Sequence, residues 1–241
     1  MIYSTKGILL HRLKYSDTKL ILKIFTEEFG LQSYLFFVSK SAKNKSKLNL
    51  LQPMYILDLQ VYHKELPGLQ KIKEVAAAEI FKTIPFNIYK QSVSLFLAEF
   101  LLKILQENEK DTKLFNFIFK SVKNFDIENT DRNNFHLYFL CELTEYLGIH
   151  PENNYSDSRK IFDTEKAKFI VGHPSHRNFF NETISFKFSE ILSEKNNKNQ
   201  IVELSNNQRR ELLQGIINFY NFHLERPGKI KSLEILAQVF S

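Results

Sequence analysis

The sequence predicts an α+β protein in which a small β-barrel, residues 1–80, precedes a mainly α-helical region, residues 81–241. Short segments in which apolar and polar residues alternate fill the first 80 residues, a pattern typical of half-buried strands. Apolar residues at helical spacing dominate the rest. The 241 residues, 43% of them hydrophobic, suffice to bury a core in one large domain or two small ones.

Turn residues divide the first 80 residues into five expected strands. Tyr15-Ser16-Asp17, Phe29-Gly30 and Pro67-Gly68 each interrupt the alternation. The expected strands are Gly7–Leu13, Thr18–Thr26, Leu31–Val38, the segment after Gln52-Pro53 with Leu57, Leu59 and Val61 on one face, and Leu69–Ala78. Five short strands suit an OB-fold barrel, although an SH3-like barrel would give much the same pattern.

The helical region shows both apolar periodicity and helix-end signals. Ser205-x-x-Gln208 is a capping box, and Gly148 is a typical C-terminal cap. The expected helices are Asn87–Gln106, Thr112–Phe125, Asn133–Leu147, Ser205–Leu224 and Ser232–Phe240. Residues 151–204 are less regular, and we expect a hairpin of Ile161–Asp163 with Phe169–Val171 and a short helix near Phe188.

Positive charge is concentrated at the N-terminal end. The net charge is +6, yet residues 1–80 carry twelve Lys and Arg against seven Asp and Glu, whereas residues 81–241 carry 21 against 20. No acidic residue occurs from Phe29 to Leu57, where four lysines crowd together. Positive charge concentrated in one part of the chain favours binding of a polyanion, such as nucleic acid or an anionic membrane surface. The simpler interpretation is a solvated loop that binds no partner.

Signals for enzymatic chemistry are weak. The seven glycines form no phosphate-binding cluster, and a single cysteine, Cys141, excludes a disulfide framework and a multi-cysteine zinc site. Pro174 breaks the helical spacing of His173 and His176, so a surface loop is the better interpretation of that pair. We therefore expect no catalysis, cofactor or metal. With neither a signal-peptide pattern nor an apolar membrane span, the expected location is the cytoplasm.

Basic and aromatic residues alternate along the expected barrel strands. Single-strand binding without base preference needs cations that follow the phosphates and rings that stack on bases. The candidate DNA-binding residues are Lys6, Arg12, Lys19, Lys23, Lys40, Lys43, Lys45 and Lys47. Tyr34 and Phe36 are candidates for base stacking, with barrel core as the alternative for either ring.

A second candidate surface lies on the helix expected at residues 112–125. Its apolar face uses Phe115, Phe119 and Val122, which leaves Phe117 between Lys113 and Lys120. A ring between two ammonium groups could accept an acidic peptide with an aromatic end. The alternative is that Phe117 packs on a neighbouring helix, because a helix in a bundle often buries two faces.

Taken together, these motifs resemble the RecO family of bacterial recombination mediators. The resemblance depends on the order of Thr5-Lys6-Gly7-Ile8-Leu9-Leu10, Tyr15-Ser16-Asp17, Phe25-Thr26-Glu27-Glu28-Phe29-Gly30-Leu31, Val38-Ser39-Lys40-Ser41-Ala42-Lys43, Lys45-Ser46-Lys47-Leu48 and Leu51-Gln52-Pro53 near the N-terminus. Towards the C-terminus it depends on Arg210-x-Leu212-Leu213, Tyr220-x-x-His223-Leu224 and Lys231-Ser232-Leu233-x-x-Leu236. Between these segments, the chain resembles the family only in its helical spacing of apolar residues.

The resemblance implies an N-terminal OB domain, a helical domain, and a non-enzymatic role in DNA repair. It implies binding of single- and double-stranded DNA, annealing, and help in loading RecA onto strands coated by single-strand-binding protein. It also implies two protein partners, RecR and the acidic C-terminal tail of single-strand-binding protein. The motif assigns DNA contacts to Lys6, Lys40, Lys43, Lys45 and Lys47, whereas Arg12, Lys19 and Lys23 follow from strand alternation.

Two features depart from the family pattern. Many relatives carry a four-cysteine zinc module, which a chain with one cysteine cannot form, so we expect residues 151–190 to be held by packing of Phe162, Phe169, Phe179 and Phe180. Ser41 stands where the family usually has glycine. Two other function classes stay open: a protein-protein adaptor whose lysines are merely solvated, and an accessory domain of an RNA-binding enzyme.

Overall fold

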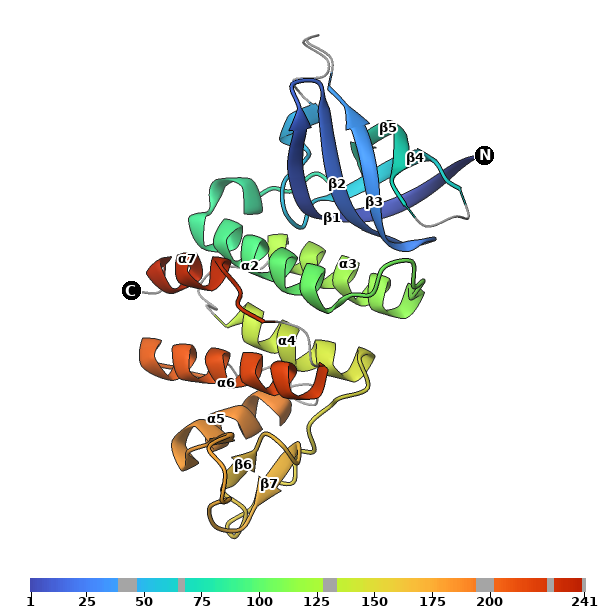
Figure 1. Ribbon diagram of the computed structural model, residues 1–241. Coiled ribbons are helices and arrows are strands. Elements are labelled where there is room, and N and C mark those ends of the chain that lie inside the picture. The colour runs from blue at the N-terminus through green and yellow to red at the C-terminus, as the bar shows by residue number, and fades with distance from the viewer. Residues whose placement is uncertain (39–46, 65–67, 128–133, 194–201, 225–227, 240–241) are drawn as a thin grey trace. The chain divides into compact units, whose positions relative to one another are not determined.

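A computed structural model describes residues 1–38, 47–64, 68–127, 134–193, 202–224 and 228–239 (Figure 1). Two compact units make up the chain: Met1–Glu128 with Ile230–Leu236, and Asn129–Lys229 with Ala237–Ser241. The barrel and the first two long helices therefore belong to the same unit. Lys40, Lys43 and Lys45 lie outside the described residues.

The first unit is built around a closed five-stranded barrel, as expected. Its strands are β1 (Ile2–Ser16), β2 (Lys19–Thr26), β3 (Gly30–Phe37), β4 (Ile56–Tyr62) and β5 (Gln70–Ala77). Their order is β1-β2-β3-β5-β4, and antiparallel pairing of β1 with β4 closes the barrel. The parallel pairing of β3 with β5 places β5 between β3 and β4, so the chain adopts the five-stranded Greek-key arrangement of the OB-fold.

Strand β1 is longer than the sequence predicts because it serves two neighbours. Its first half pairs with β4 and its second half with β2, and a register shift between Leu9 and His11 marks a β-bulge. Gly7 has no room for a side chain, because a Cβ there would approach side-chain atoms of Ile24 and Leu59 to 2.5 and 2.9 Å. Aliphatic side chains from β1, β2, β4 and β5 fill the interior together with two aromatic rings of β3, Tyr34 and Phe36.

Helices α2 (Ile88–Ile104) and α3 (Thr112–Ile127) continue the first unit beyond the barrel (Figure 1). A short 3-10 turn, η1 (Ile84–Phe86), leads into α2. The carboxylate of Asp126 on α3 accepts backbone N–H bonds from Lys82, Thr83 and Ile84 at 2.7–2.9 Å, which ties the chain leaving the barrel to α3. The buried Lys90 ammonium donates to the carbonyl oxygens of Phe125 and Asp126.

The second unit combines three helices with a small sheet, which the last two of them contact. Its helices are α4 (Phe135–Tyr146), α5 (Glu182–Ser193) and α6 (Asn206–Leu224). Its strands β6 (Ile161–Asp163), β7 (Lys168–Ile170) and β8 (Phe179–Phe180) are ordered β7-β6-β8. The capping box is confirmed, since Ser205 and Gln208 each accept a hydrogen bond from the other's backbone N–H. The expected hairpin is also confirmed, with Ile161 paired to Ile170, while β8 was not predicted.

Aromatic packing holds the small sheet. The buried Phe162 ring contacts Phe169, Phe180 and Phe188 at centroid distances of 5.0, 5.2 and 4.7 Å. Phe179 differs from the expectation, since it is half-buried and packs edge-on against the exposed His173. Within the described residues, no three His, Cys, Asp or Glu side chains are arranged to hold a metal ion. The chain's one cysteine is buried in α4, so its donor set does not fit a four-cysteine zinc module.

The last helix, α7 (Ser232–Val239), begins in the first unit. Its start is fixed to α2 by Glu99, whose carboxylate accepts hydrogen bonds from the backbone N–H groups of Lys231 and Ser232 and from the Ser232 hydroxyl. None of the helices in the described part of the chain combines the length and apolarity needed to cross a lipid bilayer.

Candidate nucleic-acid interface

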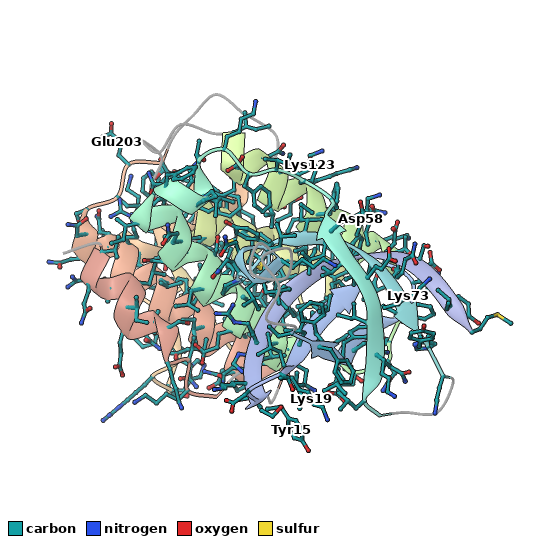
Figure 2. The ribbon with its side chains drawn as sticks, turned by 90° about the horizontal axis from the view of Figure 1, so that it is seen from above. Tyr15, Lys19, Asp58, Lys73, Lys123 and Glu203 are labelled. Atoms are coloured by element: carbon teal, nitrogen blue, oxygen red, sulfur yellow. The ribbon has the colours of Figure 1, made fainter. Side chains whose placement is uncertain are left out.

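Strand pairing brings exposed rings and lysines together at one end of the barrel. In the β1–β2 hairpin Ser16 lies opposite Lys19, and in the β2–β3 pair Lys19 lies opposite Phe37. The Lys19 ammonium is 5.6 Å from the centre of the Phe37 ring, within cation–π distance. Figure 2 shows Tyr15 and Lys19 beside one another where β1 turns into β2, pointing away from the barrel.

A groove of about 360 Å³ continues this surface across β3, β5 and β4. Lys71 on β5 lies opposite Leu35 of β3 and Tyr62 of β4, which explains why these strands share the groove. We call the groove and the hairpin end together the basic rim. It comprises Tyr15 and Lys19 at the hairpin end (Figure 2) and Phe37, Lys47, Tyr62, Lys71 and Lys73 along the groove.

The chemistry of the basic rim suits a single strand of nucleic acid. Tyr15, Phe37 and Tyr62 are 65%, 49% and 45% exposed, which leaves their rings accessible to bases. None of the described residues that line the groove is acidic, while three of them are lysines. Cations beside open rings can neutralise phosphates while the bases stack, which requires no particular base sequence.

The predicted DNA-binding residues fall into different environments. Lys19 and Lys47 belong to the basic rim. Lys6 lies opposite Asp58 with 3.9 Å between the charged atoms, and Lys23 forms an ion pair with Glu107, so each has a carboxylate competing with a phosphate. Arg12 is exposed but lines a different hollow, together with the bulge residues Leu9 and His11. The structure thus brings only part of the predicted set together.

The base-stacking prediction for Tyr34 and Phe36 needs correction. Tyr34 is 0% exposed and Phe36 is 5% exposed, because alternation along β3 turns both inward. Burial also raises the pKa of the Tyr34 hydroxyl well above its ordinary value. A ring inside the barrel cannot stack on a base, so both residues belong to the core, and the exposed ring on this strand is their neighbour Phe37.

The tail-binding arrangement on α3 also differs from expectation. Phe117 is only 5% exposed, although Lys113 and Lys120 are exposed. Helix α3 buries Leu114, Phe117 and Ile118 together, so it has a wider apolar face than the 112–125 pattern suggested. The Phe117 ring is therefore not exposed between the two ammonium groups. It is buried, as in the alternative in which it packs inside the helical bundle.

Sequence reasoning missed Tyr62, Lys71 and Lys73 as functional candidates. Tyr62 ends β4 and the two lysines lie on the outward face of β5, positions that look like ordinary solvent-facing residues in the sequence. The available signal was the alternation of Lys71 and Lys73 with the buried Ile72. Only the β3–β5 and β4–β5 pairings show that these residues share one surface with Phe37.

Comparison with known proteins identifies the family. Residues 1–81 match the family model described as recombination protein O N terminal, and residues 85–234 match recombination protein O C terminal. The chain is 34% identical over 241 residues to the DNA repair protein RecO of Azobacteroides pseudotrichonymphae and 35% identical over 243 residues to that of Flavobacterium johnsoniae, with both chains covered in full. The chain therefore belongs to the RecO family of DNA repair proteins.

Proposed function

We propose that this protein is a non-enzymatic recombination mediator that binds single-stranded DNA at the basic rim. The observation that carries the proposal is the combination of three exposed rings with four lysines on a single surface of the barrel. The lysines hold phosphates and release counterions, and the rings stack on bases. Because both contacts are indifferent to base identity, little sequence preference is expected.

Family membership supports the remaining parts of the role. The proposed activities are binding of double-stranded DNA, annealing of complementary strands, and help in loading RecA onto strands coated by single-strand-binding protein. The proposed partners are RecR and the C-terminal tail of single-strand-binding protein, and the proposed place of action is the nucleoid. Lys40, Lys43 and Lys45 lie outside the described residues and stay proposed DNA contacts; in the sequence they precede Lys47 of the rim.

The basic rim gives annealing a physical basis. Strands that stack on exposed rings keep their base edges unpaired, while neutralised phosphates lower the repulsion between two strands. Both effects favour pairing with a complementary strand. The proposal therefore requires binding without base preference and no turnover of the DNA.

The rings provide the sharpest test of this proposal. Phe37→Ala combined with Tyr62→Ala is compared with Phe86→Ala, which removes a ring that is 85% exposed and lies outside the rim. Loss of a base–ring stack costs about 1–3 kcal/mol, so the double variant should bind labelled single-stranded DNA at least about tenfold more weakly and anneal complementary oligonucleotides more slowly. The Phe86 variant should behave like wild type.

Two results of this binding experiment would contradict the proposal. Wild-type DNA affinity in the double variant would remove the rim from the proposal. If the wild-type protein itself bound no DNA at low salt, the adaptor alternative would take its place.

A further inference from the structure

The outer face of β2 and β3 carries a further lysine beyond the basic rim. Alternation along β2 turns three residues to this face, and the strand pairing sets them opposite three residues of β3: Lys19 opposite Phe37, Ile21 opposite Leu35, and Lys23 opposite Ser33. Lys23 follows the rim residue Lys19 by four positions, about 13 Å at the usual rise of a β-strand. A nucleic-acid strand that continued along this face would therefore reach Lys23.

A second, smaller hollow lies at the Lys23 end of this face. The described pairing of β3 with β5 covers residues 34–35 of β3. The groove of the basic rim opens on one side of that contact, at residues 36–37, and a hollow of about 270 Å³ opens on the other side, at residues 32–33. Glu107 lines this hollow. A strand leaving the groove along β3 would therefore enter a space that already holds a carboxylate.

The carboxylate belongs to the loop between α2 and α3, residues 106–111, which we call the acidic loop. Its three acidic residues, set against one lysine, are Glu107, Glu109 and Asp111. The backbone N–H of Asn108 donates to the Leu31 carbonyl oxygen at 3.1 Å, and the Asn108 side-chain oxygen accepts a hydrogen bond from the Gln32 amide at 2.9 Å. These bonds fix the loop to β3 beside Glu107.

Two further contacts hold the acidic loop against the barrel. Lys110 forms an ion pair with Glu28 at 2.8 Å. Gly30 leaves room for the loop backbone, because a Cβ at this position would lie 2.0 Å from the Glu109 carbonyl oxygen. The loop is thus anchored at several points, and the position of the Glu107 carboxylate follows from the fold.

The Glu107 carboxylate forms an ion pair with the Lys23 ammonium. The two side chains are 55% and 30% exposed, and an ion pair at the surface adds little to the stability of a fold. Its effect on a ligand is larger. The carboxylate takes the place that a phosphate oxygen would occupy on Lys23, and its negative charge repels a phosphate that approaches.

We propose that Glu107 is an autoinhibitory phosphate mimic: it neutralises Lys23 and confines a bound single strand to the basic rim. This inference rests on the proposed DNA binding at the rim. Each phosphate contact that is withheld lowers the affinity, and lower affinity is expressed mainly as faster dissociation. A strand held in this way is released readily to a complementary strand.

The test compares Glu107→Gln with wild type by fluorescence anisotropy of a labelled single strand over a salt series. Freeing Lys23 for one phosphate should steepen the slope of log affinity against log salt concentration by about 0.7. With 1 M salt as the reference, this slope corresponds to binding up to about eightfold tighter at about 50 mM salt. Glu109→Gln is the matched control, since it removes the same charge from the same loop. It frees no lysine from the Lys23–Glu107 pair, so its slope should stay near that of wild type.

Two more variants test whether the gain acts through Lys23. Lys23→Ala alone should bind the single strand about as wild type does, because Glu107 already neutralises this lysine. When Lys23→Ala is combined with Glu107→Gln, the gain in affinity and slope should disappear. Circular dichroism with a thermal melt verifies that each variant is folded.

The outcomes separate this inference from the proposed function. Equal affinity and slope in Glu107→Gln and Glu109→Gln, or a gain that survives the loss of Lys23, would overturn the role of Glu107 and leave DNA binding at the rim intact. A loss of affinity in Lys23→Ala as large as that in Lys71→Ala would also overturn it, since Lys23 would then already hold a phosphate. Absence of single-strand binding by folded wild-type protein would instead overturn the proposed function, and this inference with it.

Discussion

Removing three rim lysines together should flatten the salt dependence of DNA binding by a calculable amount. Lys47, Lys71 and Lys73 line one groove, and no acidic residue accompanies them in the described lining. Each phosphate neutralised on a single strand adds about 0.7 to the slope of log affinity against log salt concentration. If each lysine meets one phosphate, the triple alanine variant should lose about 2 from that slope.

The assay is fluorescence anisotropy of a labelled single strand at several salt concentrations. Between about 50 and 200 mM salt, a slope difference of about 2 makes the wild-type affinity fall about sixteenfold more than that of the variant. The matched control replaces Lys82, Lys160 and Lys168, three exposed lysines outside the rim, and should keep most of the wild-type slope. Equal slopes for the two triple variants would refute the assignment of phosphates to the rim.

Three further predictions concern stability and are measured by urea or thermal unfolding. Gly30→Ala should destabilise by at least about 2 kcal/mol, since φ is +64° and a Cβ would lie 2.0 Å from the Glu109 carbonyl oxygen; wild-type stability would contradict this. Phe162→Ala should cost about 3–5 kcal/mol by emptying the aromatic centre of the small sheet, and a cost below 1 kcal/mol would speak against that role. Burial alone would raise the pKa of Glu99, but hydrogen bonds such as those from Ser232 outweigh it and lower the pKa. The stability from this carboxylate is thus present above the ordinary Glu pKa and lost as pH falls through the lowered one. Glu99→Gln should therefore be less stable than wild type at pH 7, with a difference that narrows in acid; a constant difference would refute the linkage.

Short sequence patterns were sufficient to predict features that depend on a single strand or helix end. The alternation in Thr18–Thr26 predicts β2 to within one residue, and Ser205-x-x-Gln208 marks the start of α6 because both bonds of a capping box lie within four residues. The same alternation, applied to β3, separates the buried Phe36 from the exposed Phe37. The error at Phe36 was thus avoidable, because treating the rings as a group ignored the period of two.

The candidate site was predictable only in part. A cluster of positive charge in residues 1–80 indicated a polyanion, and two of the predicted contacts, Lys19 and Lys47, lie on the basic rim. Lys71 and Lys73 were not, because their relation to Phe37 depends on a parallel pairing between strands that are more than 30 residues apart in the chain. Phe117 was misjudged because its burial depends on a second face of α3.

The sequence by itself determined the barrel strands, the helices and the excess of positive charge near the N-terminus, since these follow from periodicity and composition within short stretches. Tertiary structure decided which charges remain available: Lys6 and Lys23 each acquire a carboxylate from another strand or loop, while Lys71 and Lys73 meet exposed rings. It also created a hollow of about 1240 Å³, lined by residues from 9–12, 49–55, 84–103 and 231–235. The physical reason is that a charged side chain can bind a ligand only if no neighbouring group already neutralises it. Closure of the barrel brings those neighbours together from distant parts of the chain.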